Sequence, residues 1–205
     1  MRAAHAKVNL WLNVVGRRAD GYHLLDSLVA FVDLADTIAA QPADRLSLEL
    51  AGPSAAALTG DADNLVLKAA RLLADRAGVS PRAAIRLEKR IPVAAGLGGG
   101  SADAAAALRM LVDLWRVALP EEELFDLAAT LGADVPMCLA GRTAVASGVG
   151  ERLQAAPALP RSKRTTFAIG VNLLRIWPSI ELSTATGQSS PTKPSMALQN
   201  RPAST

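Results

Sequence analysis

The chain has only one cysteine, few aromatic residues and no long apolar run. The single cysteine, Cys138, excludes a disulfide within the chain and favours a reducing compartment. No apolar run reaches the roughly 18 residues that suggest a membrane-spanning helix. A strand-like pattern begins almost at the first residue, so we expect no signal or transit segment. These features predict a cytoplasmic protein without a membrane partner.

Two further classes of site lack sequence support. His, Cys and acidic side chains form no cluster with metal-ligand spacing, so we expect no metal held by the protein itself. The net charge of +3 is uneven, because residues 161–205 hold six Lys and Arg against one Glu, which leaves the first 160 residues at −2. This basicity belongs to the tail and is poor evidence for a nucleic-acid partner.

The composition also changes along the chain near Pro160. Residues 161–205 contain 13 Ser and Thr, against 10 in the preceding 160 residues. Such Ser/Thr/Pro-rich sequence cannot bury enough apolar surface to offset its ordering entropy. We therefore expect a folded domain over residues 1–160 and an atypical, partly disordered tail over 161–205.

Hydrophobic periodicity predicts strands and helices in alternation before this boundary. Strand patterns cover residues 4–15, 24–38, 46–50 and 82–90, and helical patterns cover 64–77, 102–115 and 121–131. Gly78 follows the first helical pattern, as a C-terminal glycine often does. This order indicates an α/β or α+β nucleotide-binding domain.

The most informative segment holds four glycines in five positions, Gly96 and Gly98 to Gly100, and runs into an alanine-rich helical pattern. Without a Cβ, the backbone adopts positive φ and brings its N–H groups close to an anion. Ser101 is expected to open the helix as an N-cap, or to contact phosphate or magnesium. The loop lacks the lysine of G-x-x-x-x-G-K-[ST] and the third glycine of a dinucleotide fingerprint. A nucleotide-phosphate loop of another kind is favoured over a flexible linker.

Three other clusters accompany this loop: Ala6-Lys-Val-Asn-Leu10, Arg18-Ala-Asp-Gly-Tyr-His23 and Gly132-Ala-Asp-Val-Pro136. Together with Gly-Leu-Gly-Gly-Gly-Ser-Ala-Asp they resemble the GHMP kinase superfamily over about residues 4 to 153. Within it they resemble the kinases of 4-diphosphocytidyl-2-C-methyl-D-erythritol in non-mevalonate isoprenoid precursor biosynthesis. The resemblance implies an α+β N-terminal domain like domain 2 of ribosomal protein S5. It also implies ATP-dependent phosphorylation of the substrate's 2-hydroxyl.

The resemblance also assigns residues. Asp134 matches the base that takes the hydroxyl proton, and Lys7 the cation that keeps it ionised. Tyr22 and His23 match the pair at the cytidyl group, and Asn9 matches a residue near the polyol. The residues that match the nucleotide pocket, where ATP and its Mg²⁺ would bind, are Asn64, Lys89, Pro92, Gly96, Leu97, Gly98, Gly99, Gly100, Ser101 and Ala102.

Several of these residues also have simpler interpretations. Lys7 could be a solvated strand lysine, Asp134 an ordinary turn or cap residue, and Asn64 a helix N-cap. Apolar patterning predicts that the aromatic residues Trp11, Trp115 and Phe125 lie in the core. Cys138 lacks a basic neighbour in sequence, which favours a buried thiol over a nucleophile.

The resemblance ends after Pro160. Family members continue into a second domain with a further glycine-rich motif, which nothing here matches. We expect this C-terminal domain to be missing or replaced by an irregular tail, through a frameshifted or truncated reading, and the chain to be a poor or inactive kinase. A catalytically incomplete nucleotide-binding fragment stays open, as does a GHMP kinase for another small alcohol such as homoserine.

Overall fold

The computed structural model describes residues 1–58, 64–150 and 152–156. The chain divides into two units, Met1–Pro160 and Arg161–Thr205, and all described elements belong to the first. The predicted tail lies outside the described residues, so its character stays a prediction.

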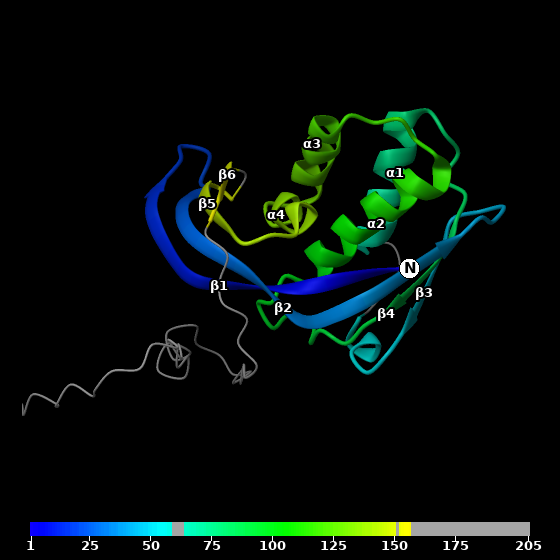
Figure 1. The fold of residues 1–205 in the computed structure, drawn as a ribbon, viewed down its shortest axis with the longest axis horizontal. Coiled ribbons are helices and arrows are strands. Elements are labelled where there is room, and N and C mark those ends of the chain that lie inside the picture. The colour runs from blue at the N-terminus through cyan, green and yellow to red at the C-terminus, as the bar shows by residue number, and fades with distance from the viewer. Residues whose placement is uncertain (59–63, 151, 157–205) are drawn as a thin grey trace, which may run out of the picture. The chain divides into compact units, whose positions relative to one another are not determined.

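The described strands form one six-stranded sheet in the order β3-β4-β2-β5-β6, with β1 paired along β2 (Figure 1). Of these pairs only β3 with β4 is parallel. The longest strand, β2, pairs with β5 through residues 25–29 and with β4 through residues 37–41. The strands are β1 (Arg2–Arg17), β2 (His23–Gln41), β3 (Ser47–Ala51), β4 (Ala84–Glu88), β5 (Ala144–Gly148) and β6 (Arg152–Ala155).

The helices gather on one side of the sheet, and α2 packs against both β1 and β2 (Figure 1). Alanines on the buried face of α2 allow this close approach, and Leu108 and Leu111 fill the space between them. The helices are α1 (Leu65–Ala77), α2 (Gly99–Trp115), α3 (Glu121–Leu131) and α4 (Val135–Ala140), and a short 3₁₀ turn, η1, covers Ala55–Ala57.

The helix termini confirm part of the sequence prediction and correct another. The side chain of Asn64 accepts a hydrogen bond from Val66 N at 2.9 Å, and Gly78 ends α1 with φ +65°. The expectation that Ser101 opens the next helix is wrong. Helix α2 begins at Gly99, because Gly98 adopts φ +66° and its carbonyl accepts the first helical bond. Ser101 lies in the first turn.

The expectation that Trp11 lies in the core is also wrong. Its side chain is 40% exposed, and Leu12, Val14 and Val15 are exposed as well. Consecutive exposed residues on a strand mean that neither face is covered by the described elements. The β1–β2 hairpin therefore extends beyond the helices, whereas Trp115 and Phe125 pack against the core as expected.

Candidate active site

Lys7 is a buried lysine in the middle of β1. Only 8% of its side chain is exposed, and an ammonium at this depth needs acceptors. Its Nζ lies 3.1 Å from Asp134 Oδ2 and donates a hydrogen bond to Asn9 Oδ1 at 2.9 Å. Three residues that the sequence analysis selected are thus in contact, and Lys7 is not a solvated strand lysine.

Irregular pairing explains how a strand residue reaches this position. The register of β1 against β2 shifts between His5 and Lys7, and again between Asn9 and Trp11. Ala6 and Lys7 are consecutive and both buried, which strict alternation does not allow. Strict alternation would place Lys7 on the same face as His5, which is exposed. The shift between the two residues turns Lys7 inward instead.

The glycine loop is fixed to the same lysine. The backbone N–H of Lys7 donates to the carbonyl of Leu97 at 2.9 Å. A Cβ on Gly98 would lie only 2.6 Å from Lys7 Cγ, so glycine is needed here both for its positive φ and for space. A Cβ on Gly96 would meet no atom within 4 Å. The loop thus packs on Lys7 at one end and is open at Gly96.

The backbone and the side chain of Asp134 have different partners. Its carbonyl accepts from Cys138 N at 3.1 Å at the start of α4, while its carboxylate makes no capping bond. The carboxylate instead pairs with Lys7 and is 43% exposed. The backbone of Asp134 thus caps α4, while its carboxylate is free to face solvent and Lys7.

The residues predicted for the cytidyl group lie apart from this cluster. Tyr22 is 61% exposed, and His23 begins β2 and is exposed. His23 precedes Ser27 by four residues, about 13 Å along a strand, and Ser27 accepts a hydrogen bond from Asn9 Nδ2 at 2.6 Å. Tyr22 and His23 thus stand at the hairpin turn, at the far end of a strand segment that leads from Asn9.

A second buried lysine lies beneath the loop. The Lys89 side chain, 4% exposed, pairs with the carboxylates of Asp36 and Asp103, the latter at 2.6 Å. Asp36 Oδ1 also accepts from the backbone N–H groups of Arg90 and Ile91, at 2.5 and 2.8 Å. The ammonium predicted for the nucleotide pocket is thus directed into the protein, and its contact with a nucleotide stays a prediction.

Asp36 and Asp103 were not identified from the sequence. Asp36 lies in a mainly apolar strand and Asp103 in an alanine-rich helix. A carboxylate in such a segment rarely lies buried without a cationic partner. That pattern is a usable signal for a buried ion pair, although it does not name the partner.

Burial raises the pKa of Asp103 to about 7, although the nearby Lys89 lowers it and Asp36 raises it further. Its Oδ1 is buried and has no hydrogen-bond partner in the described part of the chain. Burial likewise raises the pKa of the Cys138 thiol to about 12, and the charge of Asp134 adds to this. A thiol in this state is a poor nucleophile.

The other residues predicted for the nucleotide pocket surround the loop. A Cβ on Gly100 would lie 3.6 Å from Leu65 Cδ1, so the start of α1, which Asn64 caps, adjoins the start of α2. A Cβ on Gly99 would lie 3.1 Å from Ile91 Cγ2. Ala102 is buried, and Pro92, Leu97 and Ser101 are half-buried.

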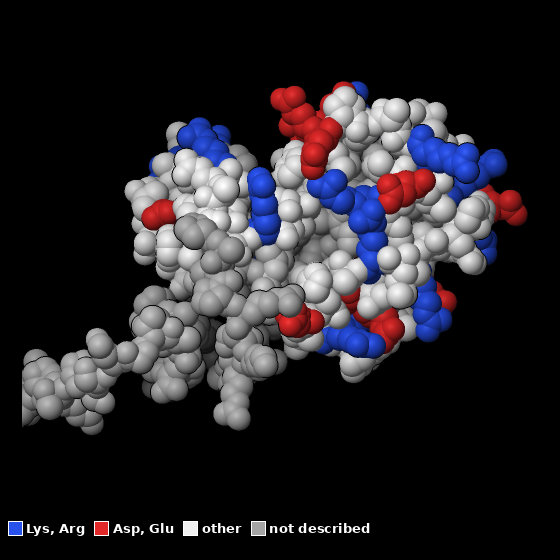
Figure 2. Space-filling view, viewed as in Figure 1, with Lys and Arg blue, Asp and Glu red and all other residues white. Residues whose placement is uncertain are grey.

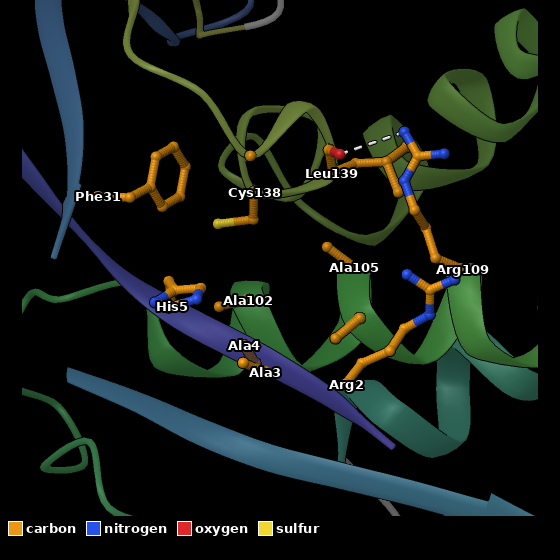
Figure 3. Close-up of a pocket in the computed structure, with 12 residues that line it drawn as sticks. Arg2, Ala3, Ala4, His5, Phe31, Ala102, Ala105, Arg109, Cys138 and Leu139 are labelled. Carbon is orange, nitrogen blue, oxygen red and sulfur yellow. Dashed lines mark hydrogen bonds between the residues drawn. The ribbon is translucent and has the colours of Figure 1, made fainter. Parts of the chain in front are cut away.

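A cavity of about 350 Å³ lies beside this site, between the first residues of β1, helix α2 and helix α4 (Figure 3). The space-filling view shows a hollow on the face that carries the helices (Figure 2). Two lining residues, Arg2 and Arg109, are already paired with Asp113 and Glu121. Lys7 and Asp134 do not line the cavity, so it is distinct from the cluster around them.

Within residues 1–58, 64–150 and 152–156, no three or more His, Cys, Asp or Glu side chains are grouped so that they could hold a metal ion. Nor does any helix there have the length and apolar character needed to cross a membrane.

Comparison with known proteins decides the family. Residues 64–142 match the GHMP kinases N terminal domain. The 4-diphosphocytidyl-2-C-methyl-D-erythritol kinase of Gluconacetobacter diazotrophicus is 54% identical over 207 aligned positions, which cover 87% of this chain and 68% of that protein. The chain belongs to the 4-diphosphocytidyl-2-C-methyl-D-erythritol kinase family of GHMP kinases.

Two further relatives agree with this family. The enzyme of the same name from Rhodospirillum rubrum is 57% identical over 162 residues, 79% of this chain and 53% of that protein. A crystal structure of 4-(cytidine 5'-diphospho)-2C-methyl-D-erythritol kinase is 48% identical, with a TM-score of 0.65 over 78% of this chain and 55% of that one. The chain spans about half the length of the first relatives it matches. The predicted family and α+β fold are confirmed.

The raised pKa of Asp103 predicts a pH-dependent stability. The unfolded side chain loses its proton near pH 3.9, whereas the folded one keeps it to about pH 7. The protonated carboxyl of Asp103 therefore contributes its full stabilisation below about pH 4, and this contribution is lost as the pH rises to about 7. Over this range we expect the free energy of unfolding to fall, by at most about 4 kcal/mol, relative to Asp103→Asn. Urea unfolding gives the free energy of unfolding of the wild type and of Asp103→Asn at each pH. Asp113→Asn, which changes an exposed site on the same helix, is the control. Parallel pH curves for wild type and Asp103→Asn would contradict the assignment.

The contact between Gly98 and Lys7 predicts unequal effects of two alanine substitutions. Gly96→Ala and Gly98→Ala both place a side chain at positive φ, which costs about 1–2 kcal/mol, but only the new methyl group at position 98 must displace Lys7. We expect Gly98→Ala to lower the free energy of unfolding by at least about 1 kcal/mol more than Gly96→Ala. Chemical denaturation provides the comparison, and equal losses would mean that Lys7 does not require the space at Gly98.

Proposed function

We propose that this chain acts in the cytoplasm as a kinase that uses ATP with Mg²⁺ to phosphorylate the 2-hydroxyl of 4-diphosphocytidyl-2-C-methyl-D-erythritol, in isoprenoid precursor biosynthesis. The observation that carries the proposal is the Lys7–Asp134 ion pair, with Lys7 also bonded to the glycine loop through Leu97. A proton acceptor, a buried cation and an open anion-binding loop thus adjoin one another. The names of the relatives support the choice of substrate.

In this proposal Asp134 removes the proton of the 2-hydroxyl. Its carboxylate is the more exposed member of the pair, at 43% against 8% for the side chain of Lys7, so it is the member that a substrate reaches. Lys7 is a donor only, so Asp134 is the member of the pair that can accept a proton. The lysine also holds the carboxylate in place, because alignment provides a large part of catalysis in phosphoryl transfer.

The loop residues fit a nucleotide phosphate. Gly96 and Gly98 have positive φ, and Gly96 faces open space. The 17-residue helix α2 begins directly afterwards, and its first N–H groups have no partner within the helix, as at any helix N-terminus. ATP supplies the phosphoryl group when bound, and Mg²⁺ arrives with it. Tyr22 offers an exposed aromatic face for the cytosine, His23 a hydrogen-bonding edge, and Asn9 a polar contact near the reacting alcohol.

Replacement of Asp134 tests the proposed reaction. The 205-residue chain is incubated for hours with ATP, Mg²⁺ and the cytidyl substrate, so that slow transfer is also detected, and the phosphorylated product and ADP are measured. We expect product from the wild type and at least about 10²-fold less from Asp134→Asn, in line with the loss of a general base. Asp113→Asn, an exposed ion-paired aspartate, should behave as the wild type. No substrate-dependent ADP release, or normal release by Asp134→Asn, would refute the proposed function or the base.

Replacement of Tyr22 tests the binding of the cytosine. Base stacking on an aromatic ring is worth about 1–3 kcal/mol. We therefore expect Tyr22→Ala to weaken the binding of the cytidyl substrate about 5- to 150-fold and to leave the binding of ATP almost unchanged. Tyr22→Phe keeps the ring and should bind nearly as tightly as the wild type. Calorimetry with each ligand separately gives both affinities, and an equal weakening of the two ligands would instead indicate a structural role for Tyr22.

A further inference from the structure

We propose that Ser27 is a positioning residue that orients the amide of Asn9 so that its oxygen faces Lys7. Ser27 does not touch Lys7 or Asp134 in this arrangement and acts through Asn9 alone. This inference rests on the proposed function, because it concerns the same site.

Ser27 is a polar residue at a buried position of β2. It is 2% exposed and pairs across the strands with Leu12. Its Oγ donates to the carbonyl of Trp11 at 2.7 Å and accepts from Asn9 Nδ2 at 2.6 Å. Its hydroxyl therefore joins two positions of β1 on either side of the register shift between Asn9 and Trp11.

The donor and the acceptor are determined for each of the hydrogen bonds that link Trp11, Ser27, Asn9 and Lys7. The carbonyl of Trp11 only accepts, so the single proton of the Ser27 hydroxyl is used there. Ser27 then has only lone pairs left for Asn9, which must present its NH₂ group. The amide oxygen of Asn9 consequently points the other way, toward the Lys7 ammonium, which only donates.

Loss of the Ser27 hydroxyl removes this constraint. An asparagine amide without a fixed partner can rotate and present its NH₂ group to Lys7, where two donors would face each other. Lys7 would then keep Asp134 as its one charged acceptor and lose its second bond. The ion pair would no longer be held in one geometry, which affects the chemical step rather than the binding of ATP at the loop.

A structural role is the alternative, because the same hydroxyl satisfies a main-chain carbonyl at an irregular strand. The two roles differ in what happens when Asn9 is already absent. A positioning role predicts that Ser27→Ala adds nothing to Asn9→Ala, whereas a structural role predicts the same loss in either background.

The first test is kinetic, with the phosphorylation assay described above. We expect Ser27→Ala to lower kcat about tenfold with little change in the KM for ATP, and the double variant with Asn9→Ala to match Asn9→Ala alone. Ser27→Cys keeps a similar volume but only a weak hydrogen-bonding group and should resemble Ser27→Ala, while Ser27→Thr keeps the hydroxyl and should recover most of kcat. Ser147→Ala, a half-buried serine on the neighbouring strand β5, is the matched control.

The second test does not depend on turnover. Hydrogen exchange of the Asn9 side-chain amide is followed by NMR in the 205-residue chain, with unfolding measured in parallel for each variant. We expect exchange about tenfold faster in Ser27→Ala and Ser27→Cys than in the wild type, Ser27→Thr or Ser147→Ala.

The two tests separate the two proposals. If no variant transfers phosphate, the proposed function fails and the amide exchange alone decides the role of Ser27. Unchanged exchange in Ser27→Ala, or kinetic losses that simply add in the double variant, would overturn the positioning role. Faster exchange together with non-additive kinetics would support it.

Discussion

The buried ammonium of Lys7 is the interaction on which the geometry of the site depends. A charge that is only 8% exposed must have acceptors, and Asn9 and Asp134 supply them from β1 and α4. The backbone of the same residue bonds to Leu97, so the glycine loop meets the strand at this point too. Gly98 is then required beside it, because any Cβ would occupy the position of the lysine stem.

The second buried lysine, Lys89, differs from Lys7 in the number and the burial of its carboxylate partners. It faces two carboxylates, and burial favours a proton on Asp103 up to about pH 7, which reduces the excess negative charge. Lys7 instead has one carboxylate, which is 43% exposed. Lys89 thus stabilises the base of the loop, and a direct contact of its ammonium with a nucleotide would require an ion pair to open. Lys7 is the lysine that reaches a solvent-accessible acid.

Periodicity predicted the elements well where packing follows it and failed where strand pairing is irregular. The helical pattern over 121–131 coincides with α3, because its apolar face packs on the core. Strict alternation in β1 failed at Lys7, since register shifts turn consecutive residues inward. Trp11 was misplaced for a related reason, because an apolar pattern does not reveal that the hairpin extends past the helices that would cover it.

The site residues likewise divide into those that the sequence identified and those that it did not. Motifs identified Lys7 and Asp134 because their spacing belongs to a family, and the structure brings the two side chains into contact. Ser27 and Asp36 lie in none of the quoted motifs, and Asp103 only ends the glycine-loop motif, in which the sequence analysis gave it no role. Each lies in a mainly apolar segment, and their partners come from distant segments, which a sequence does not pair.

The residues found in these two ways act on the same loop from opposite ends. Asp36 accepts from the backbone of Arg90 and Ile91, where the chain enters the loop, and Lys7 donates to Leu97, where it leaves. Between these anchors Gly96 faces open space. Backbone N–H groups bind an anion well only if they are held in place beforehand, because ordering them on binding would cost conformational entropy. Asp36, which pairs with Lys89, and Lys7 thus hold the backbone on both sides of Gly96.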